Sequence, residues 1–416
     1  MARIVEIVGL RTKDIYSIVA GSEDSDNANL QPSPETSHKL IADKISKKYL
    51  ERVLPKDIVT AHISGDLHIH DAEYFASRPF CRSWDLRPFL YYGFSPDNNA
   101  ITAGPAKHAE VAILQACKVL AMGQTQHAGG QGLLHGLVFL APYFEGKSYE
   151  EIKQLCQMMI YELNQMYISR GGQVIFSSIN ISPGVPKVLE SVRAVRSGQI
   201  LNKTYAEFER EVRLAFKALM EISLCGDYTG KMFPFPKLEV AIENKFIDED
   251  TWKNTLEWFD ESVPSYYELY KLAFEVVAKF GTLYFDNLLP ESKKADSSMS
   301  CTQCCAYSFA DNQDVDQFFD KKLHFEDGYH FKLGGMQAVS INLPRIAYKA
   351  ECNDKLLWKY LYDVMDKAAE IFLKKKEMIE ANKSRLRFLF QVPQKDGKVG
   401  QPYIDIDDLV YEIGIV

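Results

Sequence analysis

The chain has 416 residues and a mass of 47.4 kDa, with 46% apolar and 25% charged residues, as expected of a globular protein with a large core. Its formal net charge of −8 argues against a non-specific nucleic-acid binder, which needs a dominant positive field. The sequence contains no run of roughly 18 apolar residues to span a membrane, and its N-terminus lacks the apolar core of a signal peptide. We therefore expect a cytoplasmic protein with reduced thiols and with neither nucleic-acid nor membrane partners.

Periodic apolar residues predict an alternation of helices and strands along the chain. Helices are expected over about 36–54, 106–123, 149–169, 204–223, 264–280 and 355–385. Strands are expected at 171–182, 281–289, 338–347 and 409–416, with short β-like pieces within 57–75. This alternation favours an α/β architecture.

The chain is expected to contain two regions of different character. A polar stretch, GSEDSDNANLQPSPE, marks residues 1–60 as an N-terminal helical and linker region, and residues 61–416 carry the α/β unit. The last residues, LVYEIGIV, have the composition of a core strand, whereas termini usually carry polar residues. We therefore expect the chain to be the N-terminal part of a longer protein.

Three of the eight cysteines, Cys301, Cys304 and Cys305, lie in the stretch SCTQCCAYSF. Cys301 and Cys304 have the spacing of half a zinc or iron–sulfur site, yet no second C-x-x-C pair exists in the chain. Free cysteines are also often small buried apolar residues. Radical or redox chemistry, a buried structural role and metal binding therefore stay open for this cluster.

The string GDLHIHD places His68 and His70 two residues apart, and on a strand such residues lie on the same face. They are able to share a metal ion, as in a barrel metallohydrolase, and a hydrogen-bonded structural pair is the alternative. The glycine-rich string HAGGQG lacks the Gly-Lys-Ser/Thr ending of a phosphate loop. The run Lys374-Lys375-Lys376 is predicted to lie on a solvated helix face.

Taken together, several strings resemble one family. They follow in the order GDLHIHDAEYF, RPFCRSWDLRPFL, GGQVIFSSINIS, FPFPKLEV, LYFDN, the cysteine cluster, SINLPRIA and DLVYEIGIV. Their order is similar to that in the anaerobic (class III) ribonucleoside-triphosphate reductases, which are glycyl-radical enzymes. The resemblance implies an incomplete ten-stranded α/β barrel of the ribonucleotide reductase type, with helices for dimerisation. It also implies reduction of ribonucleoside triphosphates to deoxyribonucleoside triphosphates by thiyl-radical chemistry.

The resemblance assigns roles to two cysteine positions. Cys305, or alternatively Cys304, matches the cysteine that becomes the thiyl radical, and the arginine that follows it in the family is Ala306 here. Cys81 matches the second active-site cysteine, which faces the first across the substrate. A buried structural cysteine is the alternative for Cys81.

The resemblance also assigns roles to polar residues. His70 matches the histidine of the family's His-Asp string, and Asn342 matches an asparagine associated with formate as the reductant. Ser177, Ser178 and Asn180, on the expected first barrel strand, are predicted to contact the ribose or to satisfy backbone groups. No metal site is expected within this chain.

Cofactors and partners follow from the same resemblance. The family's glycyl radical, installed by a separate radical-SAM activase, lies on an Arg-x-x-Gly-Tyr loop that this sequence lacks. The sequence also lacks the two C-x-x-C pairs that hold zinc in the family. Formate or a thioredoxin-like protein is the expected reductant, and dNTPs and ATP are the expected effectors of a homodimer. A complementary C-terminal segment is expected to complete the enzyme, so this chain alone is expected to be inactive. The alternatives are a non-catalytic nucleotide-binding relative and a metallohydrolase that uses His68 and His70.

Overall fold

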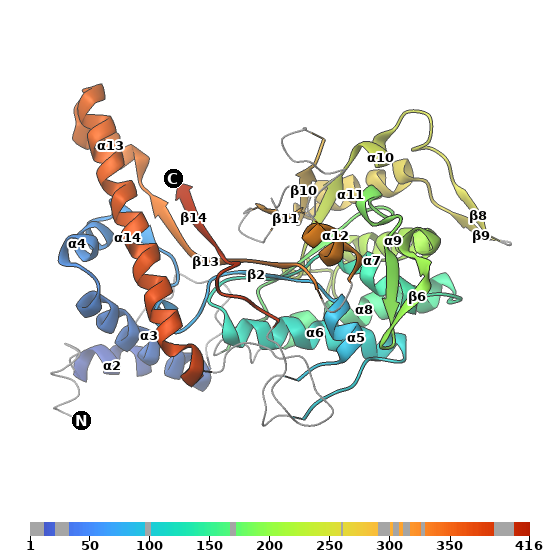
Figure 1. Cartoon of the computed structure of the whole chain (residues 1–416), viewed down its shortest axis with the longest axis horizontal. Helices are drawn as coiled ribbons and strands as arrows, with labels where there is room; N and C mark the ends of the chain where they lie inside the picture. The colour runs from blue at the N-terminus through green and yellow to red at the C-terminus, as the bar shows by residue number, and fades with distance from the viewer. Residues whose placement is uncertain are drawn as a thin grey trace.

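A mixed sheet of eight strands forms the centre of the part of the chain that the computed structural model describes (Figure 1). That part comprises residues 12–20, 33–95, 101–166, 172–258, 261–289, 300–302, 308–310, 317–325, 329–386 and 403–416. Five neighbouring strands run parallel, in the order β2 (Arg82–Trp84), β3 (Gln131–Leu133), β4 (Ser177–Ile181), β7 (Lys237–Ile242) and β10 (Leu283–Asn287).

The rest of the sheet is built around β13 (Lys332–Ile341), which pairs with β2 and with the two remaining strands. The first residues of β13 pair antiparallel with β2, and its last residues pair antiparallel with β1 (Leu67–Ile69). Strand β14 (Val410–Ile415) pairs parallel with β13. Strands β13 and β14 run opposite to the five parallel strands, whereas β1 has the same direction as β2. Together the strands form a curled half barrel, which confirms the expected incomplete α/β barrel.

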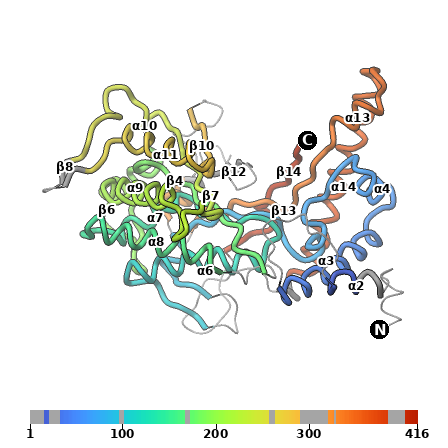
Figure 2. The backbone as a smooth tube through the Cα atoms, turned by 180° about the vertical axis from the view of Figure 1, so that it is seen from behind, coloured from blue at the N-terminus to red at the C-terminus, as the bar shows by residue number. Residues whose placement is uncertain are grey.

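Helices form two groups along the sheet, one beside the parallel strands and one beside β13, as Figure 2 shows. The parallel strands pack against α6 (Ala109–Gln126), α7 (Gly136–Leu140), α8 (Tyr149–Gln165), α9 (Glu209–Cys225) and α11 (Tyr266–Phe280) in the larger apolar core. A second core lies around β1 and the end of β13, under α3 (Pro34–Val53), α4 (Lys56–Ser64) and α14 (Asp354–Leu386). Helix α4 crosses the domain boundary expected between residues 60 and 61.

Shorter elements complete the described structure. The helices are α2 (Thr12–Val19), α5 (Arg87–Tyr92), α10 (Asn244–Ile247), α12 (Gln317–His324) and α13 (Leu343–Ala350), with 3₁₀ turns at η1 (Ala72–Tyr74), η2 (Ala141–Tyr143), η3 (Lys187–Leu189) and η4 (Tyr205–Phe208). Two-stranded ribbons form from β5 (Arg193–Arg196) and β6 (Gln199–Thr204), β8 (Leu256–Trp258) and β9 (Glu261–Val263), and β11 (Ser300–Thr302) and β12 (Ser308–Ala310). In the described ranges, no helix combines the length and hydropathy needed to cross a membrane.

Most predicted elements form, and three details differ. The strand predicted at 338–347 ends at Ile341, because Asn342 caps α13 and Pro344 occupies its first turn. Residues 57–64 form α4 and not a β-like piece. Strand β14 forms as predicted, but most of its side chains are exposed and not buried.

A buried ion pair joins the region after β2 to the end of α12. The Arg87 Nη2 lies 2.6 Å from Asp85 Oδ2, and both side chains are fully buried. Arg87 also donates hydrogen bonds to the carbonyl oxygens of Lys322 and Leu323 in the last turn of α12, and Asp85 accepts from the Phe331 N–H. Burial alone would raise the pKa of Asp85, but the Arg87 guanidinium lowers it overall.

Removing the charge of Asp85 tests how far this pair stabilises the fold. The Asp85→Asn variant leaves Arg87 buried without its counter-charge, so we expect a loss of about 3–5 kcal/mol in the free energy of unfolding, measured with urea. The matched control is Glu145→Gln, which removes a partly exposed ion-pair partner of Arg196 and Lys203 and is expected to change stability little. Similar midpoints for the two variants would contradict the role given to the buried pair.

Candidate active site

Cys81 is fully buried and lies immediately before β2, between β13 and the segment that leads into β3. The Gly335 N–H donates to the Cys81 carbonyl at 2.8 Å, and the Phe80 N–H donates to the Gly335 carbonyl at 2.9 Å. On the other side, the Gly129 N–H donates to the Phe80 carbonyl at 2.8 Å. Backbone hydrogen bonds therefore hold Cys81 from both sides.

Glycines surround Cys81 because no other side chain fits there. A Cβ atom on Gly129 would overlap the Cys81 Sγ, and a Cβ on Gly334 would lie 2.8 Å from the Cys81 carbonyl oxygen. The string HAGGQG, which lacks a phosphate-loop ending, therefore provides space for the thiol. A Cβ atom on Gly335 would overlap the carboxylate of Glu412, a buried acid of β14. Because Gly335 is hydrogen-bonded to Cys81, Glu412 lies next to the neighbour of Cys81.

His70 lies close to Phe80, the residue that precedes Cys81. Its ring centroid is 6.1 Å from that of Phe80, the residue before Cys81, and its Nε2 lies 2.7 Å from the Ser340 Oγ. The His70 N–H donates to the Ala338 carbonyl at 3.2 Å, and the His70 carbonyl accepts from Gln337. The hydrogen-bonded pairing with β13 thus sets His70 close to the strand that also holds Cys81.

The two faces of the parallel strands differ in what covers them. A Cβ on Gly123 of α6 would lie 3.0 Å from the Trp84 Nε1, and a Cβ on Gly136 of α7 would lie 2.6 Å from Ile179. Trp84 and Ile179 therefore face the helices. Ser177 shares the face of Ile179, whereas Ser178 and Asn180 lie on the opposite, inner face, because side chains alternate along a strand.

The inner face carries small and polar residues at matching positions of three neighbouring strands. Ser83, Gly132 and Ser178 are register partners across β2, β3 and β4. Ser178 is buried, and no hydrogen-bond partner of its hydroxyl is present among the described residues. Strand β4 lies in the middle of the sheet and is not the first barrel strand that the sequence predicted.

Asn180 and Glu239 form a buried polar pair on this inner face. They are register partners on β4 and β7, and the Asn180 Nδ2 donates to the Glu239 Oε2 at 2.7 Å. Neither Glu239 nor Glu412 is among the site residues predicted from the sequence. The available signal was a lone acidic residue inside each of the apolar strands KLEVAI and VYEIGI.

Asn342 lies away from Cys81. Six residues of β13 lie between Asn342 and Gly335, the neighbour of Cys81, which corresponds to roughly 20 Å along a strand. Its Oδ1 accepts the Arg345 N–H at 3.0 Å and caps α13. Cys304 and Cys305 lie outside the described residues, in the sequence that connects β11 to β12.

The histidines near β1 do not form a metal site. His68 lies between His62 and His70, with ring centroids 5.3 and 4.9 Å away, and burial followed by the neighbouring imidazole lowers the pKa of both His62 and His68. Within the described ranges, no group of three or more His, Cys, Asp or Glu side chains is placed to hold a metal ion. The metallohydrolase alternative therefore has no structural support in this part of the chain.

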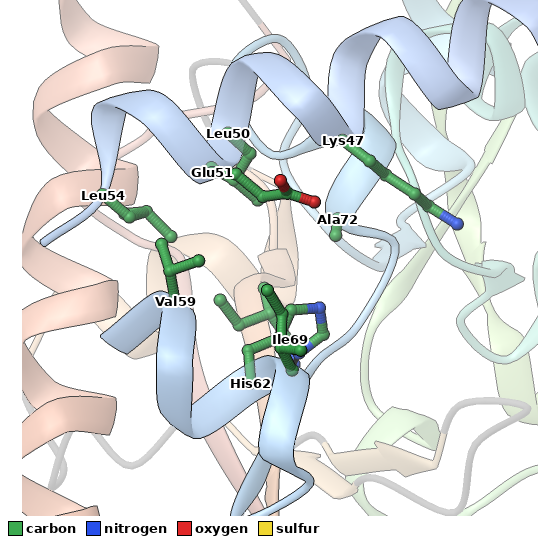
Figure 3. Close-up of a pocket in the computed structure, with 9 residues that line it drawn as sticks. Lys47, Leu50, Glu51, Leu54, Val59, His62, Ile69 and Ala72 are labelled. Carbon is green, nitrogen blue, oxygen red and sulfur yellow. Dashed lines mark hydrogen bonds between the residues drawn. The ribbon is translucent and has the colours of Figure 1, made fainter. Parts of the chain in front are cut away.

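A small cavity lies beside His62, between α3, α4 and β1 (Figure 3). Its volume is about 120 Å³, and it is lined mainly by apolar side chains such as Leu50, Leu54 and Val59, while the Lys47 amine points away from them. Ligand pockets usually have about 300–1,000 Å³. This cavity is therefore too small for a nucleotide, and the candidate active site is the inner face of the sheet beside Cys81.

Fold and site together define an α/β half-barrel protein with a buried thiol at the edge of a polar inner face. A family model described as anaerobic ribonucleoside-triphosphate reductase matches residues 26–415. The chain therefore belongs to the anaerobic ribonucleoside-triphosphate reductase family, which confirms the family that the sequence resembles.

Curated relatives agree with this assignment. The anaerobic ribonucleoside-triphosphate reductase of Escherichia coli is 22% identical over 381 residues, which are 84% of this chain and 46% of that protein. The Haemophilus influenzae protein is 23% identical over 409 residues, covering 90% of this chain and 50% of the relative. The chain thus spans about half the length of the curated relatives it matches.

The fold is also similar to that of a solved reductase. The anaerobic ribonucleotide reductase of Thermotoga maritima, with dATP bound in its specificity site, superposes with a TM-score of 0.61 at 16% identity. The comparison covers 99% of this chain and 64% of the other. At this identity the similarity shows the fold alone.

A substitution at Gly129 tests whether the glycines shape the site around Cys81. Gly129→Ala forces the new methyl group into the Cys81 thiol, so we expect about 1–3 kcal/mol of destabilisation and a changed alkylation rate of Cys81. Gly104→Ala is the matched control, because no atom lies within 4 Å of its Cβ position. Urea unfolding and mass spectrometry of alkylated peptides measure both effects. Equal behaviour of the two variants would contradict the close contact.

Proposed function

We propose that this chain is the N-terminal part of the catalytic subunit of an anaerobic ribonucleoside-triphosphate reductase, active in the cytoplasm. The observation that carries the proposal is Cys81, a buried thiol beside the polar inner face, in a chain that belongs to this family. Cys81 is proposed to act as the family's second active-site cysteine, together with Cys305, or alternatively Cys304, as the cysteine that becomes the thiyl radical. His70, near Phe80 and β13, helps to shape this end of the site.

Ser178 and Asn180 are proposed to contact the ribose. Both side chains lie on the inner face, and the buried Ser178 hydroxyl is able to donate to a sugar oxygen and to accept from a sugar hydroxyl. The position of Ser177 on the helix-covered face supports a structural role better than a ribose contact. The distance of Asn342 from Cys81, together with its role as a helix cap, supports a formate-related role for Asn342 less well than a structural one.

The reaction needs groups that this chain does not carry. A glycyl radical on a complementary C-terminal segment, installed by a radical-SAM activase, supplies the hydrogen-atom abstraction that makes a cysteine of this chain a thiyl radical. Formate or a thioredoxin-like protein is the proposed source of electrons. This chain holds the substrate, excludes water around the buried Cys81 and carries the reacting thiols. We also propose a homodimer regulated by dNTPs and ATP.

Complementation tests the proposed function. We expect the activated C-terminal portion of a related reductase, added with the reductant under anaerobic conditions, to convert CTP to dCTP only when this chain is present. Cys81→Ala should reduce dCTP formation to background, whereas Cys117→Ala, which removes a buried thiol on α6, should retain it.

Chromatographic detection of dCTP provides the measurement. Turnover that survives Cys81→Ala would exclude a catalytic role for that thiol. Nucleotide binding without turnover in every combination would instead favour a non-catalytic, nucleotide-binding relative.

A further inference from the structure

Lys375, in the middle of the Lys374–Lys376 run on α14, is completely buried, contrary to the predicted solvated face. The side chains of its neighbours Lys374 and Lys376 are 42% and 37% exposed and form ion pairs with Glu377 and Asp407 at 2.8 Å. Burying an ammonium group is costly unless the protein provides hydrogen-bond partners. The contacts of Lys375 therefore show what this position stabilises.

Among the described residues, the hydrogen bond and the aromatic contact of the Lys375 amine both go to the segment between His70 and Cys81. The Nζ donates a hydrogen bond to the Arg78 carbonyl and lies 4.9 Å from the centroid of the Phe75 ring. Two helical turns further along α14, the Asn382 Nδ2 donates to the Ala76 carbonyl at 3.3 Å. Helix α14 thus holds residues 75–78 at two points.

The opposite side of the same segment is also anchored. The Arg78 guanidinium lies 4.3 Å from the Tyr74 ring centroid and 3.5 Å from the Gln124 carbonyl near the end of α6. At the start of the segment, Asp71 has a left-handed backbone conformation with a φ of 46°, which is uncommon for a residue other than glycine. Contacts on both sides therefore maintain this turn and, three residues after Arg78, the position of Cys81.

We propose that Lys375 is a positioning residue of the candidate active site: its amine holds the 71–80 segment against α14 and thereby sets where Cys81 lies. The residue reaches the thiol only through the backbone of that segment. The relevance of this arrangement for catalysis rests on the proposed function. The arrangement itself is testable without any turnover.

The charges that face Lys375 indicate how this contact depends on pH. Burial lowers the pKa of Lys375 from 10.5 to about 7, and the opposing effect of the Asp71 carboxylate is smaller. His127, a basic side chain within electrostatic range, stays neutral near pH 7, because burial lowers its pKa to about 3. Arg78 contributes its carbonyl oxygen, while its guanidinium contacts Tyr74 and Gln124.

The sign of the pH effect follows from proton binding. Between pH 7 and 10.5 an opened, solvated Lys375 binds a proton that the closed, buried amine lacks. The closed segment therefore becomes more stable as pH rises through this window, and a fall in pH favours opening. For one such group the opened fraction increases about tenfold from pH 8 to pH 6 and changes little below that.

Hydrogen exchange of the full chain tests the proposal. We expect exchange at the Ser77, Arg78 and Phe80 amides, corrected for intrinsic rates, to become about tenfold faster from pH 8 to pH 6 in the wild type. Lys375→Met removes the titrating amine at similar length and should abolish this change. Lys374→Met and Lys376→Met are the matched controls and should keep the wild-type profile. Alkylation of Cys81, measured relative to Cys117, should follow the same pattern.

A second variant separates local from global effects. Asn382→Ala removes the other anchor and should speed exchange at residues 76–78 by the same factor at every pH. The proposal is overturned if Lys375→Met keeps the wild-type pH profile, or if it speeds exchange equally in the distant helix α8. If Lys375→Met does not fold, the wild-type protein and Asn382→Ala still test the proposal. A wild-type protein whose exchange does not respond to pH, or an Asn382→Ala variant with unchanged exchange at residues 76–78, contradicts it. Failure of the complementation assay alone would contradict the proposed function and not this arrangement.

Discussion

The pairing of β13 with three other strands is the constraint on which the rest of the structure depends. Its first residues bond to β2, its last residues bond to β1, and β14 lies along its other edge. Met336 and Ala338 of β13 lie in the larger core, whereas Val339 and Ile341 lie in the second core. One strand thus joins both apolar clusters, and the residues before β2 and after β1 take their positions from it. Cys81 and His70 occupy these two places, so the geometry of the candidate site depends directly on the register of β13.

The site also depends on glycines, which leave room for close contacts around Cys81. Glycines at 129, 334 and 335 lie where β13 and the residues before β3 approach Cys81, and a methyl group at any of them would meet a neighbouring atom. Close backbone approach at these glycines fixes the position of the Cys81 thiol. The Asp85–Arg87 pair is held differently, because both buried charges form an ion pair and additional hydrogen bonds to backbone groups. Rigidity around the site therefore comes from backbone pairing and from this ion pair.

Much of the fold was predictable from the sequence, because long periodic segments determine helices such as α8 and α14, and the order of the family strings determined the barrel type. Other features depended on packing that no local pattern contains. The three consecutive lysines have the composition of a solvated face, and only the approach of residues 75–78 buries the middle one. The start of α13 could have been predicted from the sequence, since an asparagine followed two residues later by a proline is a common way to begin a helix.

The placement of Ser177 and Ser178 shows what family resemblance alone leaves undecided. Resemblance identifies the string that contains both serines, but adjacent residues of a strand lie on opposite faces. The helix contacts of Ile179 decide which face is covered, and they assign Ser177 to the helices and Ser178 to the inner surface with Asn180 and Glu239. The serine beneath the helices and the serine on the inner face are both buried and are neighbours in the sequence. Strand parity combined with one packing contact therefore separates the serine that faces the helices from the serine on the inner face.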